Sequence, residues 1–168
     1  MRHMLTPLAA LALAACSGGD GDGTSITFNG ETENGTATTI STDGNSGAMK
    51  IDVPGFKADI ALPKLKLDAG DFEMNGVNLY PGSTITSMNI TDGGNEGEGS
   101  GGVRVRFAAP AAADVVQGWF RGKLSEAGFK LTNQGSGLTG TTEEGKPFRM
   151  ELTPNGAAAS AGTITISG

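Results

Sequence analysis

The stretch MKIDVPGFKADIAL, residues 49–62, holds the clearest structural pattern in the chain. Apolar and polar side chains alternate along residues 49–53 and again along 56–62, and the pair Pro54-Gly55 separates the two runs. A period of two puts every second side chain on the same face of a β-strand, and Pro-Gly suits the central positions of a tight turn. We therefore expect two half-buried strands that form a hairpin.

Residues 24–80 around this hairpin are predicted to form a small β region. The run 36–42 is rich in β-branched residues and ends at Asp43-Gly44, which predicts a further strand and a turn. Three or four short strands with so few large apolar side chains make a thin sheet. We expect such a sheet to need the rest of the protein to cover its apolar face.

Residues 81–168 are predicted to form an α+β domain. Strands are expected on both sides of a flexible Gly-rich loop at 93–102, and a helix is expected from Pro110 to Ala127, ended by Gly128. Further strands follow the helix. The predicted fold class is α+β: short N-terminal β-strands followed by an antiparallel β-β-α-β-β-β sheet, with one helix packed on one face.

The N-terminus holds the only cysteine of the chain, Cys16, behind a short apolar stretch. Arg2 and His3 give a basic start, residues 5–14 are almost entirely apolar, and small residues precede the cysteine. The run Leu13-Ala14-Ala15-Cys16 resembles the lipobox of bacterial lipoproteins.

This resemblance implies a lipid-anchored protein of the bacterial cell envelope. Residues 1–15 would be a lipoprotein signal peptide that is removed, and the Cys16 thiol would carry the lipid that attaches the chain to the membrane. The expected location is the outer membrane, facing the periplasm. The Gly- and Asp-rich residues 16–23 would form a tether between the lipid and the folded part. The alternatives are an ordinary secretory signal, cut after residues 12–14, and a buried apolar helix.

The C-terminal half is similar to small α+β modules of exported bacterial proteins. The residues that carry this similarity belong to turns and to packing: Leu79-Tyr80-Pro81-Gly82, Trp119-Phe120, Lys123-Leu124 and Gly128-Phe129. Such residues shape a fold rather than a chemical site, so the resemblance implies no activity.

The composition argues against most catalytic chemistry. The 168 residues include one histidine and one cysteine, His3 and Cys16, so the remainder of the chain has neither. Histidine-dependent triads, Cys–His nucleophiles, zinc sites and disulfides need these residues. We therefore expect a non-enzymatic binding or scaffolding protein with no metal and no cofactor. The alternative is a carboxylate-dependent hydrolase of envelope glycans that uses Asp68, Asp71 and Glu73.

Charge suggests one surface for partner contacts. The net charge of −6, with one Trp and one Tyr for base stacking, disfavours nucleic acid. Strand alternation nevertheless puts three arginines on the open face of the second sheet, with a lysine near a hairpin end: Arg104, Arg106, Arg149 and Lys146. Guanidinium groups suit phosphate or carboxylate, so this surface predicts an anionic envelope component. The alternatives are a solvated face and a face covered by the acidic residues 24–80.

A second candidate surface is an edge of the predicted helix, formed by Val115, Gly118, Trp119 and Gly122. Glycine inside a helix costs about 1 kcal/mol against alanine, and glycines four residues apart let another backbone approach closely. We expect this edge to dock residues 24–80 or an envelope protein. Internal packing of the tryptophan is the alternative.

Overall fold

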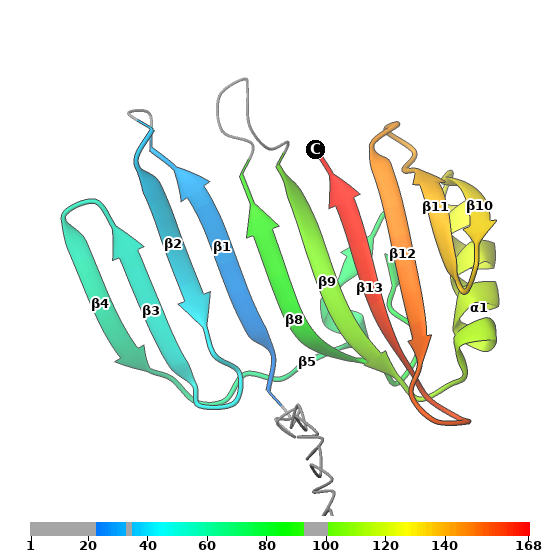
Figure 1. The fold of residues 1–168 in the computed structure, drawn as a ribbon, viewed down its shortest axis with the longest axis horizontal. Helices are drawn as coiled ribbons and strands as arrows, with labels where there is room; N and C mark the ends of the chain where they lie inside the picture. The colour runs from blue at the N-terminus through cyan, green and yellow to red at the C-terminus, as the bar shows by residue number, and fades with distance from the viewer. Residues whose placement is uncertain (1–22, 33–34, 93–100) are drawn as a thin grey trace, which may run out of the picture.

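The computed structural model describes residues 23–32, 35–92 and 101–168 (Figure 1). In this part of the chain, eleven strands form one large sheet, and β6 and β7 form a separate hairpin. Ten strands of the sheet are neighbours in the order β10-β11-β12-β13-β9-β8-β1-β2-β3-β4. The eleventh strand, β5, pairs with β8 outside this order. The bounds are β1 Ser25–Glu31, β2 Ala37–Thr42, β3 Ala48–Val53, β4 Phe56–Ala61, β5 Leu67–Asp68, β6 Glu73–Met74, β7 Val77–Asn78, β8 Thr84–Thr91, β9 Gly102–Ala109, β10 Lys130–Gln134, β11 Gly137–Thr141, β12 Pro147–Pro154 and β13 Ser160–Ser167, with the 3-10 helix η1 Ala69–Asp71 and the α-helix α1 Ala113–Glu126.

The predicted α+β class is wrong, because the described residues form a predominantly β structure with a single α-helix. The sheet is mixed, whereas the predicted sheet was antiparallel. The N-terminal strands are part of this same sheet, whereas the prediction put them in a separate region before it. β1 pairs with β8 in parallel, with Ser25 opposite Ser87 and Phe28 opposite Ile90. This pairing joins the N-terminal strands edge to edge to the strands near the helix. Local alternation predicts strands, but it does not predict a pairing between segments so far apart in the chain.

The elements that the sequence predicted individually lie close to their predicted positions, whereas β1, β5, β6 and β7 had no individual prediction. The stretch 49–62 forms the hairpin of β3 and β4, with Pro54-Gly55 in its turn. The helix begins at Ala113, three residues after Pro110, and four strands follow it rather than three. Gly128 has a φ of +89°, the left-handed conformation that commonly ends a helix. Among the described residues no helix is both long enough and apolar enough to cross a membrane.

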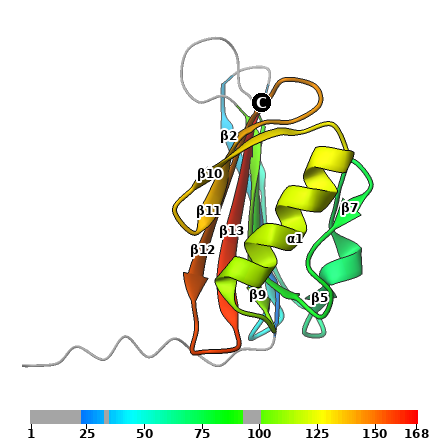
Figure 2. The same ribbon diagram turned by 90° about the vertical axis from the view of Figure 1, so that its right-hand side faces the viewer.

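A second layer covers one face of part of the sheet (Figure 2). It consists of α1, which packs on β10 to β13, and the segment 69–80, which follows β5 and lies beside the helix. The helix buries a stripe of apolar side chains at helical spacing, in which Val116, Phe120 and Leu124 are fully buried. They meet the inward side chains of the sheet, including Val105, Phe107, Leu138, Phe148, Met150 and Ile164. The hydrophobic core therefore sits between this layer and the β8–β13 part of the sheet.

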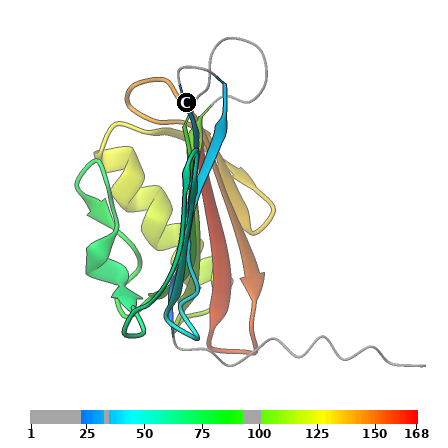
Figure 3. The ribbon, with the colours of Figure 1, turned by 90° about the vertical axis from the view of Figure 1, so that its left-hand side faces the viewer.

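The strands β1 to β4 lie outside the second layer (Figure 3). Contrary to the expectation, the other described residues do not cover the apolar face of these strands, because the strands extend the sheet sideways instead of packing face to face against another layer. The two faces of this part differ: apolar side chains lie on the face that carries α1 elsewhere, and charged and hydroxyl side chains lie on the other.

Candidate functional site

The predicted arginines lie on one polar face of the sheet, the face opposite α1. Strand register aligns Arg104 of β9, Thr165 of β13 and Arg149 of β12 in one row across the strands. A neighbouring row holds Arg106, Thr163 and Glu151. Aligned residues of paired strands point to the same face, so the structure brings the three arginines together as the alternation predicts.

Two of the four predicted basic residues are neutralised by their own neighbours. Arg149 donates from Nη2 and Nε to Glu151, at 2.7 and 3.1 Å, and Lys146 pairs with Glu144 at 3.0 Å. Arg104 and Arg106 are exposed, and no carboxylate of the described residues lies within ion-pairing distance of either. The structure therefore narrows the predicted basic surface to these two side chains of β9.

Polar side chains surround the two arginines. Ser87 and Asn89 of β8 lie beside Arg106 and Arg104, and Thr163 and Thr165 of β13 flank them on the other side. A shallow hollow of about 190 Å³ at this end of the sheet is lined by Asn89, Thr91, Gly101, Gly102, Val103, Arg104, Thr165, Ile166 and Ser167. Guanidinium, amide and hydroxyl groups all donate hydrogen bonds, so this surface can bind phosphate or carboxylate oxygens.

The acidic N-terminal strands do not cover the arginines. Asp52 and Asp59 lie on the same polar face but on β3 and β4, at the far side of the sheet. Asp52 pairs instead with Lys57 at 2.8 Å, and this carboxylate raises the pKa of Lys57 by a hydrogen bond and by its charge. The alternative of a covered face therefore does not apply to the described residues.

The candidate docking edge of α1 faces solvent. Nothing lies within 4 Å of a Cβ placed at Gly118 or Gly122, and Val115 is 51% exposed. Trp119 is half buried and makes edge-on contacts with Tyr80 and Phe120, at ring-centre distances of 5.7 and 4.9 Å. The tryptophan thus has a packing role, and the described N-terminal strands do not dock at the glycines.

An exposed apolar surface is the feature that sequence reasoning missed. We call it the open apolar face; it consists of Ile26, Phe28, Ile40, Met49, Ile51, Val53, Phe56, Ala58 and Ile60. Phe28, Phe56 and Ile60 are 38%, 56% and 42% exposed, and the remaining members are half buried. The alternation that predicted the strands also predicts this face, but it does not show whether anything covers it.

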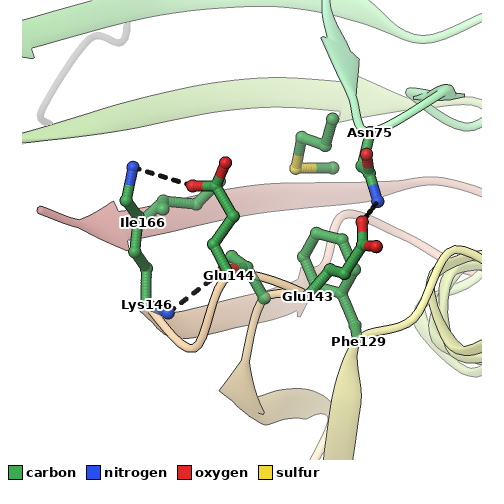
Figure 4. Close-up of a pocket in the computed structure, with 8 residues that line it drawn as sticks. Asn75, Phe129, Glu143, Glu144, Lys146 and Ile166 are labelled. Carbon is green, nitrogen blue, oxygen red and sulfur yellow. Dashed lines mark hydrogen bonds and ion pairs between the residues drawn. The ribbon is translucent and has the colours of Figure 1, made fainter.

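A pocket of about 270 Å³ lies where β6–β7, β10 and the β11–β12 turn meet (Figure 4). Met74, Phe129 and Ile166 give it an apolar floor, and Glu143 and Glu144 stand at its rim. Figure 4 shows the two carboxylates turned to different partners: Glu143 accepts a 2.6 Å hydrogen bond from Asn75 Nδ2, and Glu144 pairs with Lys146. Asn75 Nδ2 also donates to the main-chain oxygen of Ala127 at 2.8 Å, so these contacts fasten a turn to the helix end.

The acidic residues of the hydrolase alternative serve local turns. The main-chain N–H of Asp68 donates to Asp71 at 2.7 Å, and the N–H of Gly76 donates to Glu73 at 3.1 Å. All three acidic side chains are exposed. Within the described ranges, no three His, Cys, Asp or Glu side chains gather closely enough to hold a metal ion.

Several sequence predictions fall outside the described residues. They are the signal peptide 1–15, the lipid site Cys16, the tether up to residue 22 and the Gly-rich loop from 93 to 100.

The chain was also compared with known proteins. It matches no model of a protein family, no curated protein and no solved structure.

Proposed function

We propose that this chain is a lipid-anchored, non-enzymatic binding protein of the bacterial cell envelope, placed at the outer membrane and facing the periplasm. The run Leu13 to Cys16 supports the anchor through its resemblance to a lipobox. The residues between Cys16 and β1 are rich in Gly and Asp, a composition that suits a flexible tether between a lipid and the folded part. The binding surface is the polar face around Arg104 and Arg106.

The observation that carries this proposal is the position of those two arginines. They lie two residues apart on β9, near the middle of a broad sheet, and both are exposed. The carboxylates that neutralise Arg149 and Lys146 lie on β12 and in the turn before it, not beside β9. A pair of exposed guanidinium groups with hydroxyl and amide neighbours suits bidentate binding of phosphate. The proposed ligand class is therefore a phospholipid of the envelope with a net negative charge.

The net negative charge of the chain is compatible with such a ligand. Asp52 and Asp59 are four and five strands away from β9 along the sheet, which is about 19 and 24 Å at roughly 4.8 Å per strand. Exposed charges further apart than about 8 Å are largely screened at physiological ionic strength. Asp52 and Asp59 therefore contribute little to the electrostatic potential at a phosphate near β9.

The test is binding to lipid vesicles by residues 16–168 with Cys16→Ser, so that neither a lipid nor the apolar residues 5–14 contribute to binding. Vesicles that contain phosphatidylglycerol should bind the chain, and vesicles of phosphatidylcholine should not. The double substitution Arg104→Gln, Arg106→Gln should weaken binding about 30-fold, because each basic side chain near an anionic surface contributes about 1 kcal/mol. Added salt should weaken the binding of the protein that keeps both arginines, because it screens their charges.

The double substitution Arg149→Gln, Glu151→Gln is the matched control, because it removes an ion pair from the same face without changing the net charge of that face. It should change binding much less than the substitution of Arg104 and Arg106. Equal binding to both kinds of vesicle, or an equal effect of the control, would contradict the proposal.

A further inference from the structure

The strand β4 forms an open edge of the sheet (Figure 1). In the described part of the chain no strand pairs with its outer side, and its apolar side chains Phe56 and Ile60 are 56% and 42% exposed. Unpaired N–H and C=O groups on such an edge are a template for pairing with another chain. β10, at the opposite edge, offers a poorer template because Leu131 is its single large apolar side chain.

The backbone of β4 shows which residues offer these groups. The two-residue turn Pro54-Gly55 makes Val53 and Phe56 a hydrogen-bonded pair, so even-numbered residues of β4 direct their main-chain groups toward β3. The N–H of Leu62, which donates to the main-chain oxygen of Gly47 at 2.7 Å, continues this pattern. Odd-numbered residues therefore direct their main-chain groups outward: Lys57, Asp59 and Ala61.

When β4 pairs symmetrically with β4 of a second copy, one register places unlike charges opposite each other. Antiparallel pairing centred on Ala58 puts Lys57 opposite Asp59 of the second copy, and it does so twice because of the two-fold axis. The same register makes these two residues the hydrogen-bonded pairs and puts Phe56 opposite Ile60 on the apolar face. Centring on Lys57 or on Asp59 puts two like charges directly opposite each other, which is destabilising.

The charge pattern continues into β3. Within one copy Asp52 lies opposite Lys57, in a 2.8 Å ion pair, and Lys50 lies opposite Asp59. In the register centred on Ala58, the charges across the four central strands of the dimer alternate: Asp52 and Lys57 of one copy, then Asp59 and Lys50 of the second.

We propose that β4 pairs with β4 of a second copy of this chain, antiparallel about a two-fold axis between the two Ala58 residues. The dimer forms one sheet through both copies, and the open apolar faces of the two copies become continuous. This inference depends on β4 alone, not on the lipid anchor or on the phosphate surface.

Disulfide formation tests the register. In the full chain with Cys16→Ser, Ala58→Cys introduces the only thiol. The two Cα atoms at position 58 would be about 4.5 Å apart, as in other non-hydrogen-bonded pairs, which is within the range of a disulfide. Oxidation should therefore give a covalent dimer. Ala61→Cys is the matched control on the same strand, because its two copies would be roughly 20 Å apart and should remain monomeric on a denaturing gel.

Charge exchange tests the partner. Lys57→Glu alone and Asp59→Lys alone each put like charges opposite one another, and each should reduce the Ala58→Cys dimer about tenfold. A mixture of the two variants, tagged to differ in size, should restore a heterodimer, because both pairs across the interface between the two copies are again of unlike charge. Restoration also shows that both variants fold.

The inference is overturned if Ala58→Cys gives no dimer, or if Ala61→Cys forms one equally well. It is also overturned if the mixture fails to restore dimerisation, since a different strand or protein would then occupy the edge. Sedimentation of the chain with Cys16→Ser alone should give the mass of a dimer, and a monomer at tens of micromolar would exclude the proposal without any substitution in β4.

Discussion

Phe28 of β1 lies opposite Ile90 of β8 in the parallel strand pair that joins the two parts of the sheet. Ile90 in turn lies opposite Val103 of β9, so one apolar row runs from the open apolar face toward the core. In the next row, Met88 of β8 lies between Ile26 of β1 and the fully buried Val105 of β9. Among the described residues, the same sheet face is therefore covered over β9 and open over β1.

Thr24 should stabilise the entry into β1 through its hydroxyl. Its buried Oγ1 donates to the main-chain oxygen of Ile85 and accepts from the N–H of Leu67 at 3.0 Å. Thr24→Val keeps the shape but leaves both partners without this bond, so it should lower the free energy of unfolding by about 1–3 kcal/mol. Urea denaturation measures the change. Thr24→Ser keeps the hydroxyl and should lose less; a valine variant as stable as the wild type would contradict this role.

Phe120→Ala should be the most damaging substitution in α1. Its side chain is fully buried against Phe107 and Trp119, so truncation should cost about 3–5 kcal/mol. Val115→Ala on the exposed side of the same helix is the control and should stay within about 0.5 kcal/mol of the wild type. Similar thermal melts for the two variants would argue against the packing of α1 on the sheet.

Two glycines should respond in opposite ways to replacement by alanine. At Gly118 a Cβ meets nothing within 4 Å, so Gly118→Ala should stabilise the protein by about 1 kcal/mol through helix propensity. At Gly162 a Cβ would overlap the ring of Phe107, so Gly162→Ala should destabilise it by about 1–3 kcal/mol. Denaturation curves compare both with the wild type. Loss of stability in Gly118→Ala would mean that the helix edge is packed against something.

Local patterns predicted much of the fold but not its class. The alternation in 49–62 and the turn residues at 54–55 act between neighbours in the chain, so β3 and β4 could be predicted. The parallel contact of β1 with β8 brings together residues such as Thr27 and Asn89, and no local period encodes that choice of partner. Without it, the N-terminal strands were expected as a separate region.

The candidate site was predictable to a similar extent. Period two correctly put Arg104, Arg106 and Arg149 on one face, because side-chain direction on a strand depends only on the backbone. The neutralising partner of Arg149 was missed, although Glu151 stands two residues further on and thus on the same face. The exposure of Phe28 was not predictable, because it depends on where the second layer ends.

The lipid anchor makes a prediction that is independent of the folded part. Cys16→Ser removes the thiol that would accept the lipid, so the precursor should stay unprocessed, or its product should leave the membrane fraction once added salt screens the arginine surface. Metabolic labelling with a radioactive fatty acid should label the wild type and not this variant. Absence of label from the wild type would favour an ordinary secretory signal.

The central structural claim is that one sheet runs through the chain, covered by a second layer only in part. A nuclear Overhauser spectrum of the chain with Cys16→Ser tests it most directly. It should show backbone contacts between Thr27 and Asn89, which are paired in the parallel register, and no contact between the ring of Phe28 and Trp119 of α1. Contacts from the Phe28 ring to Trp119, without contacts between β1 and β8, would show the N-terminal strands folded over the helix and would contradict the claim.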